Sequence, residues 1–112
     1  MMKIEAIIRP GKLDEVKDAL NDAGIHGMMV SQIIGCGHQK GRKEVYRGTE
    51  YSMNLLPKIK LEVVVPDDKV DTCVKAICKA AHSGEIGDGK IFIYPLTNAI
   101  RIRTGETGDS AI

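Results

Sequence analysis

Apolar and charged residues alternate along two stretches of the chain, as they do in β-strands that bury one face. Residues 3–9 alternate in this way up to a Pro-Gly pair, and residues 57–65 repeat the pattern up to Pro66. Residues 29–34 are rich in β-branched and sulfur-containing side chains, and residues 90–96 follow a glycine-rich turn. We therefore expect four strands.

Two segments between these strands have the three- and four-residue apolar spacing of an α-helix. Residues 12–23 form the first, and Gly24 follows where a C-terminal cap belongs. The second has the more regular stripe, with Val70, Cys73, Val74, Ile77, Cys78 and Ala81. We expect both of its cysteines on the buried side of the helix.

The element order is thus βαββαβ. On a single domain of 112 residues this order predicts a ferredoxin-like α+β sandwich, with four antiparallel strands backed by two helices on one face. A long loop separates the second and third strands. Residues 36–56 lack periodicity and hold three glycines and six charged residues, and loops of this length are usually functional or disordered.

Composition mainly excludes classes of protein. A net charge of +1 and 43% hydrophobic residues indicate one soluble globular domain rather than a general nucleic-acid binder. No segment approaches the roughly 20 apolar residues of a membrane span, and Glu5 and Arg9 interrupt any export signal, so we expect a cytoplasmic protein. Three cysteines without C-x-x-C spacing predict free thiols, and the light aliphatic core favours oligomerisation.

The most specific local pattern is Ser83-Gly84-Glu85-Ile86-Gly87-Asp88-Gly89-Lys90. Backbone N–H groups of glycines can converge on one anion and the lysine adds charge, which favours a phosphate. Ile91 follows where a P-loop has Ser or Thr, and the segment runs from helix to strand, so it is not a P-loop. An equally simple interpretation is a tight helix-to-strand connection with a solvated lysine.

Arg101 and Arg103 lie two residues apart on a short alternating tail, so we expect them to share a face. Together with Lys90 they could neutralise a triphosphate whose inner oxygens accept hydrogen bonds from the glycine amides. The alternative is that these arginines are peripheral charges paired with Glu85 or Glu106.

Binding is favoured over catalysis. The three histidines lack neighbouring residues for a catalytic triad, and Cys36-Gly37-His38 is too short for a metal site. A small phosphate-cleaving enzyme on the same fold is the alternative, although no residue is an evident water-activating base. An RNA-recognition module shares the element order, but residues 3–9 and 58–65 contain none of the stacking aromatics it needs.

The motif Tyr46-Arg47-Gly48-Thr49-Glu50-Tyr51, together with residues 83–93, is similar to two motifs of the P-II nitrogen-regulatory signal proteins. The resemblance continues through residues 4–10, 56–60, 65–70 and 100–106, and so describes residues 1–112 as a single P-II-like domain. It implies a homotrimer that binds ATP or ADP in clefts between subunits and senses 2-oxoglutarate with Mg-ATP. The flexible loop, about residues 37–55, would control a nitrogen-metabolism target.

The target would be an ammonium transporter, a glutamine-synthetase-linked factor, a transcription factor or a biosynthetic enzyme, with no direct contact to nucleic acid and membrane contact only through a partner. Carried over by position, the resemblance assigns the nucleotide to Ile7, Gly35, Gly37, His38, Gln39, Glu62, Val64, Gly87, Asp88, Gly89, Lys90, Arg101 and Arg103. It assigns 2-oxoglutarate to Gln39, Lys58 and Gly87, and magnesium to Gln39 with ligand oxygens. Tyr51 matches a tyrosine that receives a nucleotidyl group in some bacterial members.

Two positions depart from the family pattern. His38 stands where many members carry Arg, so one phosphate contact would depend on pH around the imidazole pKa of ~6.5. Met29 stands where the family commonly has Thr, and this removes a hydroxyl that could hydrogen-bond the adenine.

Overall fold

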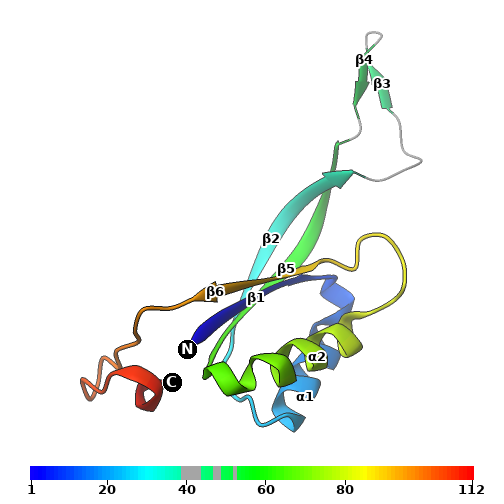
Figure 1. Ribbon diagram of the computed structural model, residues 1–112. Coiled ribbons are helices and arrows are strands. Elements are labelled where there is room, and N and C mark those ends of the chain that lie inside the picture. The colour runs from blue at the N-terminus through cyan, green and yellow to red at the C-terminus, as the bar shows by residue number, and fades with distance from the viewer. Residues whose placement is uncertain (39–43, 47–48, 52) are drawn as a thin grey trace.

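A four-stranded antiparallel sheet with two helices on one face forms the body of the protein, as seen in a computed structural model (Figure 1). The structure describes residues 1–38, 44–46, 49–51 and 53–112. The strands are β1 (Met2–Ile8), β2 (Met29–His38), β3 (Glu44–Tyr46), β4 (Thr49–Tyr51), β5 (Met53–Val65) and β6 (Lys90–Pro95). The helices are α1 (Leu13–Asp22) and α2 (Val70–Ala81), with 3-10 turns at Pro10–Lys12, Asp67–Lys69 and Gly108–Ala111.

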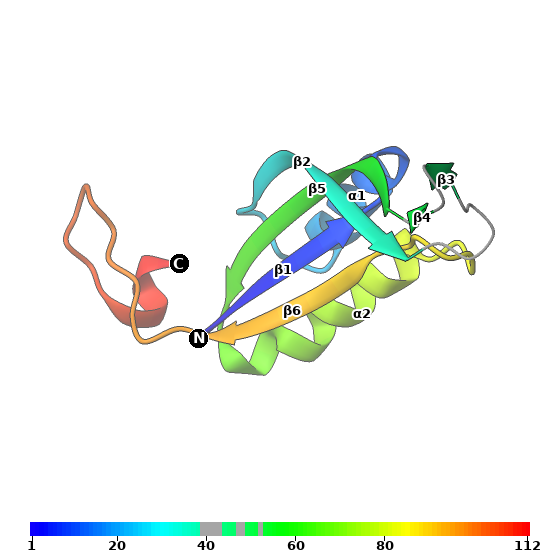
Figure 2. The ribbon, with the colours of Figure 1, turned by 90° about the horizontal axis from the view of Figure 1, so that it is seen from above.

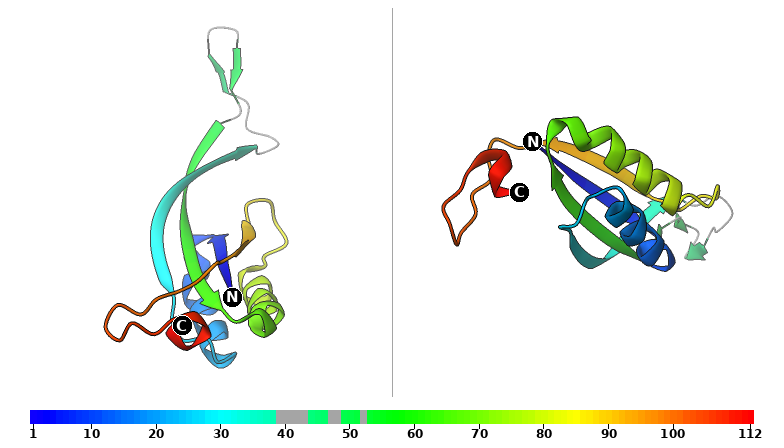
Figure 3. Two further views of the ribbon diagram at one scale, coloured as in Figure 1. Left: turned by 60° about the vertical axis from the view of Figure 1, so that its left-hand side comes forward. Right: turned by 90° about the horizontal axis from the view of Figure 1, so that it is seen from below.

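The order of strands in the main sheet is β2-β5-β1-β6, and each neighbouring pair is antiparallel. Both helices lie over the same face, as Figure 3 shows from below, whereas Figure 2 shows the strands uncovered from above. This α+β arrangement fits the ferredoxin-like fold predicted from the sequence. Among the described residues, no helix is long and apolar enough to cross a membrane.

The alternation of the central strands decides which face is buried. Ile4, Ala6 and Ile8 of β1 and the alternate residues of β5, among them Leu61, are buried beneath the helices. The residues between them, such as Glu5, face the uncovered side and are only half-buried. The sheet therefore has one apolar face and one face that mixes charged and apolar side chains.

Helix α2 has the bounds that its apolar stripe predicts, but its two cysteines differ. Cys73 is buried, which raises the pKa of its thiol to about 11, whereas Cys78 is exposed. The prediction that both lie on the buried side is wrong. Five residues at about 100° each place Cys78 roughly 140° around the helix from Cys73, on the flank of the stripe.

The segment between the second and third predicted strands is more regular than its sequence suggested. Strand β2 continues to His38 and β5 begins at Met53, so the two strands pair well beyond the helices, and β3 and β4 pair with each other. Figure 1 shows this β2–β5 arm rising from the body. An arm with no helix beneath it needs no alternating apolar face, and this is why periodicity missed it.

The tail around Arg101 also differs from the expected alternating segment. The Arg101 N–H donates to the Glu106 carbonyl (2.8 Å), and the Gly105 N–H donates to the Arg101 carbonyl (2.7 Å). Gly105 has a φ of +74°, which glycine adopts without strain and which reverses the chain. The prediction that Arg101 and Arg103 share the face of an extended segment is therefore wrong.

Candidate functional site

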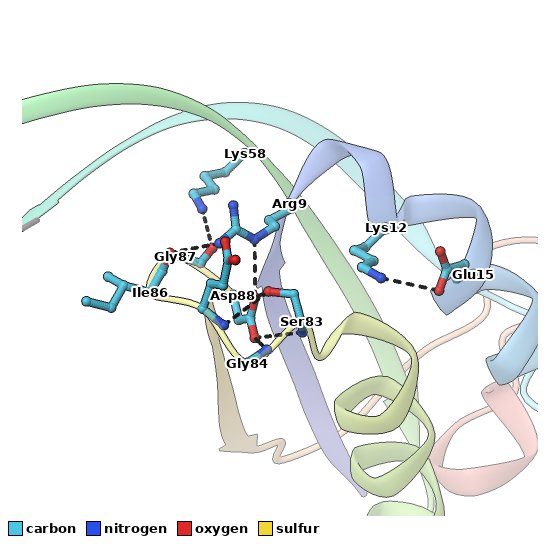
Figure 4. A network of polar contacts seen from close by, with 10 residues as sticks. Arg9, Lys12, Glu15, Lys58, Ser83, Gly84, Ile86, Gly87 and Asp88 are labelled. Atoms are coloured by element: carbon cyan, nitrogen blue, oxygen red, sulfur yellow. Dashed lines mark hydrogen bonds and ion pairs between the residues drawn. The ribbon is translucent and has the colours of Figure 1, made fainter.

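The glycine-rich loop between α2 and β6 folds around the carboxylate of Asp88 (Figure 4). One carboxylate oxygen accepts hydrogen bonds from the backbone N–H groups of Ser83 (2.8 Å) and Gly84 (3.0 Å). The other accepts a hydrogen bond from the Ser83 hydroxyl. These contacts close the loop into a ring, with the hydroxyl of Ser83 also accepting from the N–H of Glu85 (3.3 Å).

Arg9, the residue directly after β1, reaches the same loop from the body of the protein. Its Nε donates to Asp88 Oδ1 (3.2 Å) and its Nη2 donates to the carbonyl of Ile86 (2.8 Å). The hydrogen bonds from Ser83, followed by those from Gly84 and Arg9, hold the pKa of the Asp88 carboxyl well below its usual range. Asp88 is therefore an anion whose donors come from its own loop and from Arg9.

Gly89 stands where the loop enters β6 and presses against β1. Its φ is +104°, and a Cβ built on it would lie 1.7 Å from the carbonyl oxygen of Ile7. A side chain cannot occupy that space, so glycine is required by contact as well as by conformation. The next residue, Lys90, pairs with Ile7 across the strands and has an exposed side chain.

Lys58 of β5 approaches the loop from the other side. Its Nζ donates to the Gly87 carbonyl (2.6 Å), and the side chain is half-buried. Burial lowers the pKa of Lys58, and the nearby charge of Arg9 lowers it further, although Asp88 opposes both. Gly35 lies beneath this lysine, since a Cβ there would be 3.4 Å from Lys58 Cγ.

Three cations belong to this region: Arg9, which directly follows β1, Lys58 of β5 and Lys90, the first residue of β6. Two carboxylates of the loop partly balance them: Asp88, which pairs with Arg9, and the exposed Glu85. Backbone amides and an excess of positive charge around a turn can hold a phosphate or a carboxylate. We call residues 83–90, with Arg9 and Lys58, the loop half-site.

A second group of predicted residues lies at the opposite end of the sheet. Glu62 and Val64 of β5, together with Met29 of β2, line a cavity of about 630 Å³. Asp109 and Ile112 of the C-terminal segment line the same cavity. We call this cavity, with the turn that carries Arg101 and Arg103, the tail half-site.

The two half-sites of one chain are far apart. Lys58 and Val64 are six residues apart on one strand, which at about 3.3 Å per residue is roughly 20 Å. Lys90 begins β6, and the tail leaves its other end (Figure 1). The structure therefore does not bring Lys90 together with Arg101 and Arg103 within one chain. Arg101 instead pairs with Glu106 (3.6 Å), which is one of the two pairings considered from the sequence.

The remaining predicted residues lie as follows. Gly35, Gly37 and His38 are in β2, opposite Leu56, Asn54 and Met53 of β5. Tyr51 is in β4, opposite Glu44. Gln39, which the resemblance assigns to magnesium and 2-oxoglutarate, lies outside the described residues. In the described part of the chain, no three His, Cys, Asp or Glu side chains gather into a metal-sized cluster.

Sequence reasoning gave Arg9 no role at the loop. The sequence hinted at this contact in one way: Arg9 precedes Pro10-Gly11 and Asp88 lies between Gly87 and Gly89, so that two opposite charges each stand beside a turn. The two residues are 79 positions apart, so their contact depends on the pairing of β1 with β6.

Comparison with known proteins bears on this arrangement. The family described as nitrogen regulatory protein P-II matches residues 1–106. The chain is 57% identical to nitrogen regulatory protein P-II of Haemophilus influenzae over 112 residues, which is 100% of both chains. The same values hold for nitrogen regulatory protein P-II 1 of Escherichia coli K12. The chain belongs to the P-II family.

A third P-II relative, from Pasteurella multocida, is 55% identical over the full length of both chains. The resemblance inferred from the motifs is therefore confirmed. Membership of the P-II family supports a role as a nitrogen-regulatory signal transducer that acts on targets in nitrogen metabolism. The relatives are named as regulatory proteins and not as enzymes.

Proposed function

We propose that this P-II protein binds ATP or ADP in a cleft formed by the loop half-site of one copy and the tail half-site of the next. With Mg-ATP present it also binds 2-oxoglutarate, and the β2–β5 arm then controls a target protein. The observation that carries the proposal is the distance between the half-sites, because one chain cannot bring Lys90 and Arg101 to the same phosphate chain.

The chemistry of each half-site suits a different part of a nucleotide. The loop half-site supplies glycine amides and Lys90, which suit phosphate oxygens. The tail half-site has an apolar cavity beside Glu62, which suits an adenosine whose amino group needs an acceptor. The guanidinium groups of Arg101 and Arg103 are suited to the same phosphates as Lys90.

The two edges of the sheet support association in a ring. Strand β2 forms one edge, with Ile34 73% exposed and Met29 59% exposed. Strand β6 forms the other, with Phe92 45% exposed and Tyr94 40% exposed. Because the edges are different surfaces, contact between them would be head-to-tail, and such contacts close into rings when the rotation allows. A ring of three copies is the trimer that the P-II resemblance implies.

The uncovered sheet face also favours a partner. The hydroxyl of Tyr94 donates to Glu5, and Lys60 lies 3.6 Å from Glu5 and 3.5 Å from Glu62. These contacts leave the charges of the face largely paired among themselves. A face whose charges are already satisfied can be covered by other copies at lower cost than one with unpaired charges.

Lys58 is the proposed contact for 2-oxoglutarate. Its ammonium group is within the loop half-site, and the acceptor that it has among the described residues is a neutral carbonyl, that of Gly87, at 2.6 Å. A ligand carboxylate is a stronger acceptor for an ammonium group than a carbonyl is. Because Lys58 lies on β5, the same strand that forms the arm, occupancy of this site can alter the arm's conformation.

The test is complementation between two variants that each lose one half-site. Lys90→Ala should weaken ATP binding at the loop half-site and Arg101→Ala at the tail half-site, each by roughly ten- to a hundred-fold. The two variants are unfolded together, refolded as a mixture and titrated with ATP by calorimetry. Random mixing in a ring should restore full affinity at about a quarter of the clefts.

Lys79→Ala is the matched control, because Lys79 is an exposed cation on α2 outside both half-sites. It should bind ATP like the parent, and a parallel phosphate-release assay separates binding from turnover. Recovery of no high-affinity sites in the mixture would place the complete nucleotide site within one chain. Unchanged ATP affinity of both single variants would reject the assignment of the half-sites.

A further inference from the structure

The ring of hydrogen bonds around Asp88 has a consequence for the proposed phosphate site, because a carboxylate beside a phosphate would repel it. Both Asp88 carboxylate oxygens accept hydrogen bonds: Oδ1 from Arg9 and the Ser83 hydroxyl, and Oδ2 from the N–H groups of Ser83 and Gly84. The carboxylate is thus turned inward, with the charge of Arg9 against it at 3.2 Å. The loop keeps an acid in its centre whose negative charge is neutralised locally.

We propose that Asp88, Ser83 and Arg9 form a clamp that positions the glycine-rich loop for anion binding, with Asp88 acting through the loop backbone and not as a ligand. The inference rests on the proposed function, since it concerns how the loop half-site is held ready for phosphate. It assigns these three side chains a positioning role that the family motif alone does not give them.

The geometry of Arg9 supports this role. Nε holds Asp88 and Nη2 holds the Ile86 carbonyl, so the guanidinium joins two points of the loop to the end of β1. Gly87 packs closely on the same guanidinium, because a Cβ built there would lie 3.2 Å from Nη2. The Arg9 side chain is 35% exposed, so most of its surface is shielded from water where it pairs with Asp88.

The geometry of Ser83 supports it from the other end. Ser83 follows α2 closely, and both its N–H and its hydroxyl donate to Asp88 five residues later. The chain between them must then turn within a closed ring of hydrogen bonds. A loop with this ring loses less conformational entropy when an anion arrives than an open loop of the same glycine content would.

The experiment compares Ser83→Ala, Asp88→Asn and Arg9→Gln with the parent in two measurements. Hydrogen exchange of the amides of residues 84–89 is followed without nucleotide, and affinities for ATP and inorganic triphosphate are measured by calorimetry. Each variant should exchange these amides faster and bind both ligands roughly ten-fold more weakly. Ser83→Thr, which keeps the hydroxyl, should restore both properties.

Two controls isolate the clamp. Ser110→Ala removes a hydroxyl that donates to the Thr107 carbonyl (2.9 Å) in the C-terminal segment, away from the loop. Lys12→Gln removes a cation that lies at the same end of the protein as Arg9 but pairs with Glu15 (3.5 Å) (Figure 4). Both should leave loop exchange and triphosphate affinity at the parent values.

Arg9→Gln and Asp88→Asn should also be non-additive. Once Arg9 is absent, Asp88 is an uncompensated anion, so the double variant should bind triphosphate no more weakly than Arg9→Gln alone. Losses that multiply in the double variant would overturn the clamp. Unchanged loop exchange in the three single variants, or faster exchange with unchanged affinity, would overturn it as well.

Parent protein that binds triphosphate but not ATP would refute the proposed nucleotide function while the clamp is still tested on triphosphate. Parent protein that binds neither ligand would refute both proposals.

Discussion

Gly89 has a role that depends on a contact with a distant part of the chain. Its φ of +104° is unfavourable for any other residue, and a Cβ would meet the Ile7 carbonyl at 1.7 Å. Gly105 has a similarly positive φ of +74° but has nothing within 4 Å of a built Cβ. A substitution at Gly105 therefore carries only the cost of a positive φ, whereas a substitution at Gly89 adds a steric clash with β1.

Gly89→Ala should lower the free energy of unfolding by roughly 2–4 kcal/mol, because strain and displacement of β1 add. Gly105→Ala should cost only about 1 kcal/mol, the conformational part. Urea denaturation of both variants and the parent measures the difference. Equal losses in the two variants would mean that Gly89 does not press against β1 in solution.

Asp88 predicts how the stability of the loop depends on pH. Its pKa is lowered in the folded protein, so its contribution to stability is present above the ordinary pKa of about 3.9 and is lost as the pH falls from there through the lowered pKa. The stability difference between the parent and Asp88→Asn should be constant from about pH 7 to 5 and shrink below about pH 4.

Urea unfolding across this pH range provides the measurement. Asp14→Asn is the control, because Asp14 is an exposed carboxylate on α1 outside the loop. If the difference in free energy of unfolding between the parent and Asp88→Asn stays constant down to about pH 3, Asp88 does not act as a charged group in the clamp.

At the scale of elements, α2 shows how a regular apolar stripe is used. Ile77 is 1% exposed and Cys73 is fully buried, so the centre of the stripe lies on the sheet. Cys78 lies on the flank, beside a cavity of about 320 Å³ at the β6 edge. The stripe predicts the helix and the centre of its buried face, whereas Cys78 at the edge of the stripe stays exposed.

Ile77→Ala should destabilise the protein by about 2–5 kcal/mol, since a large side chain is removed from a packed core. Lys75→Ala, an exposed change on the same helix, should stay within about 0.5 kcal/mol of the parent. Denaturant midpoints of both variants compare them directly. A loss below about 1 kcal/mol for Ile77→Ala would contradict the packing of α2 on the sheet.

At the scale of the whole molecule, the sheet has two open edges and an uncovered face. The proposed ring would cover both edges and complete the nucleotide cleft in the same step. Assembly and ligand binding would then depend on one interface, so that each stabilises the other.

The protein should sediment as a trimer at micromolar concentration. Because bound ATP stabilises the interface, the trimer should dissociate only at lower protein concentrations when ATP is present. Sedimentation equilibrium with and without ATP measures both effects. The parent sedimenting as a monomer under these conditions would contradict the ring. Arg101→Ala should assemble like the parent but show little response to ATP.

The sequence by itself determined the order of the elements in the body, without β3 and β4, as well as the bounds of α2 and the position of the glycine-rich loop, because each depends on residues that are neighbours in the chain. Apolar spacing tells which face of a helix or strand is buried, and glycines mark where the chain can turn. Motif order and spacing were also sufficient to identify the P-II family.

Only the tertiary structure decided which residues of these elements come into contact. Pairing of β1 with β6 brings Arg9 to Asp88 across 79 residues and presses Gly89 against Ile7. The same strand order holds Arg101 at the other end of the sheet from Lys90. Local spacing carries no information on such distances, because they depend on how strands far apart in sequence lie side by side.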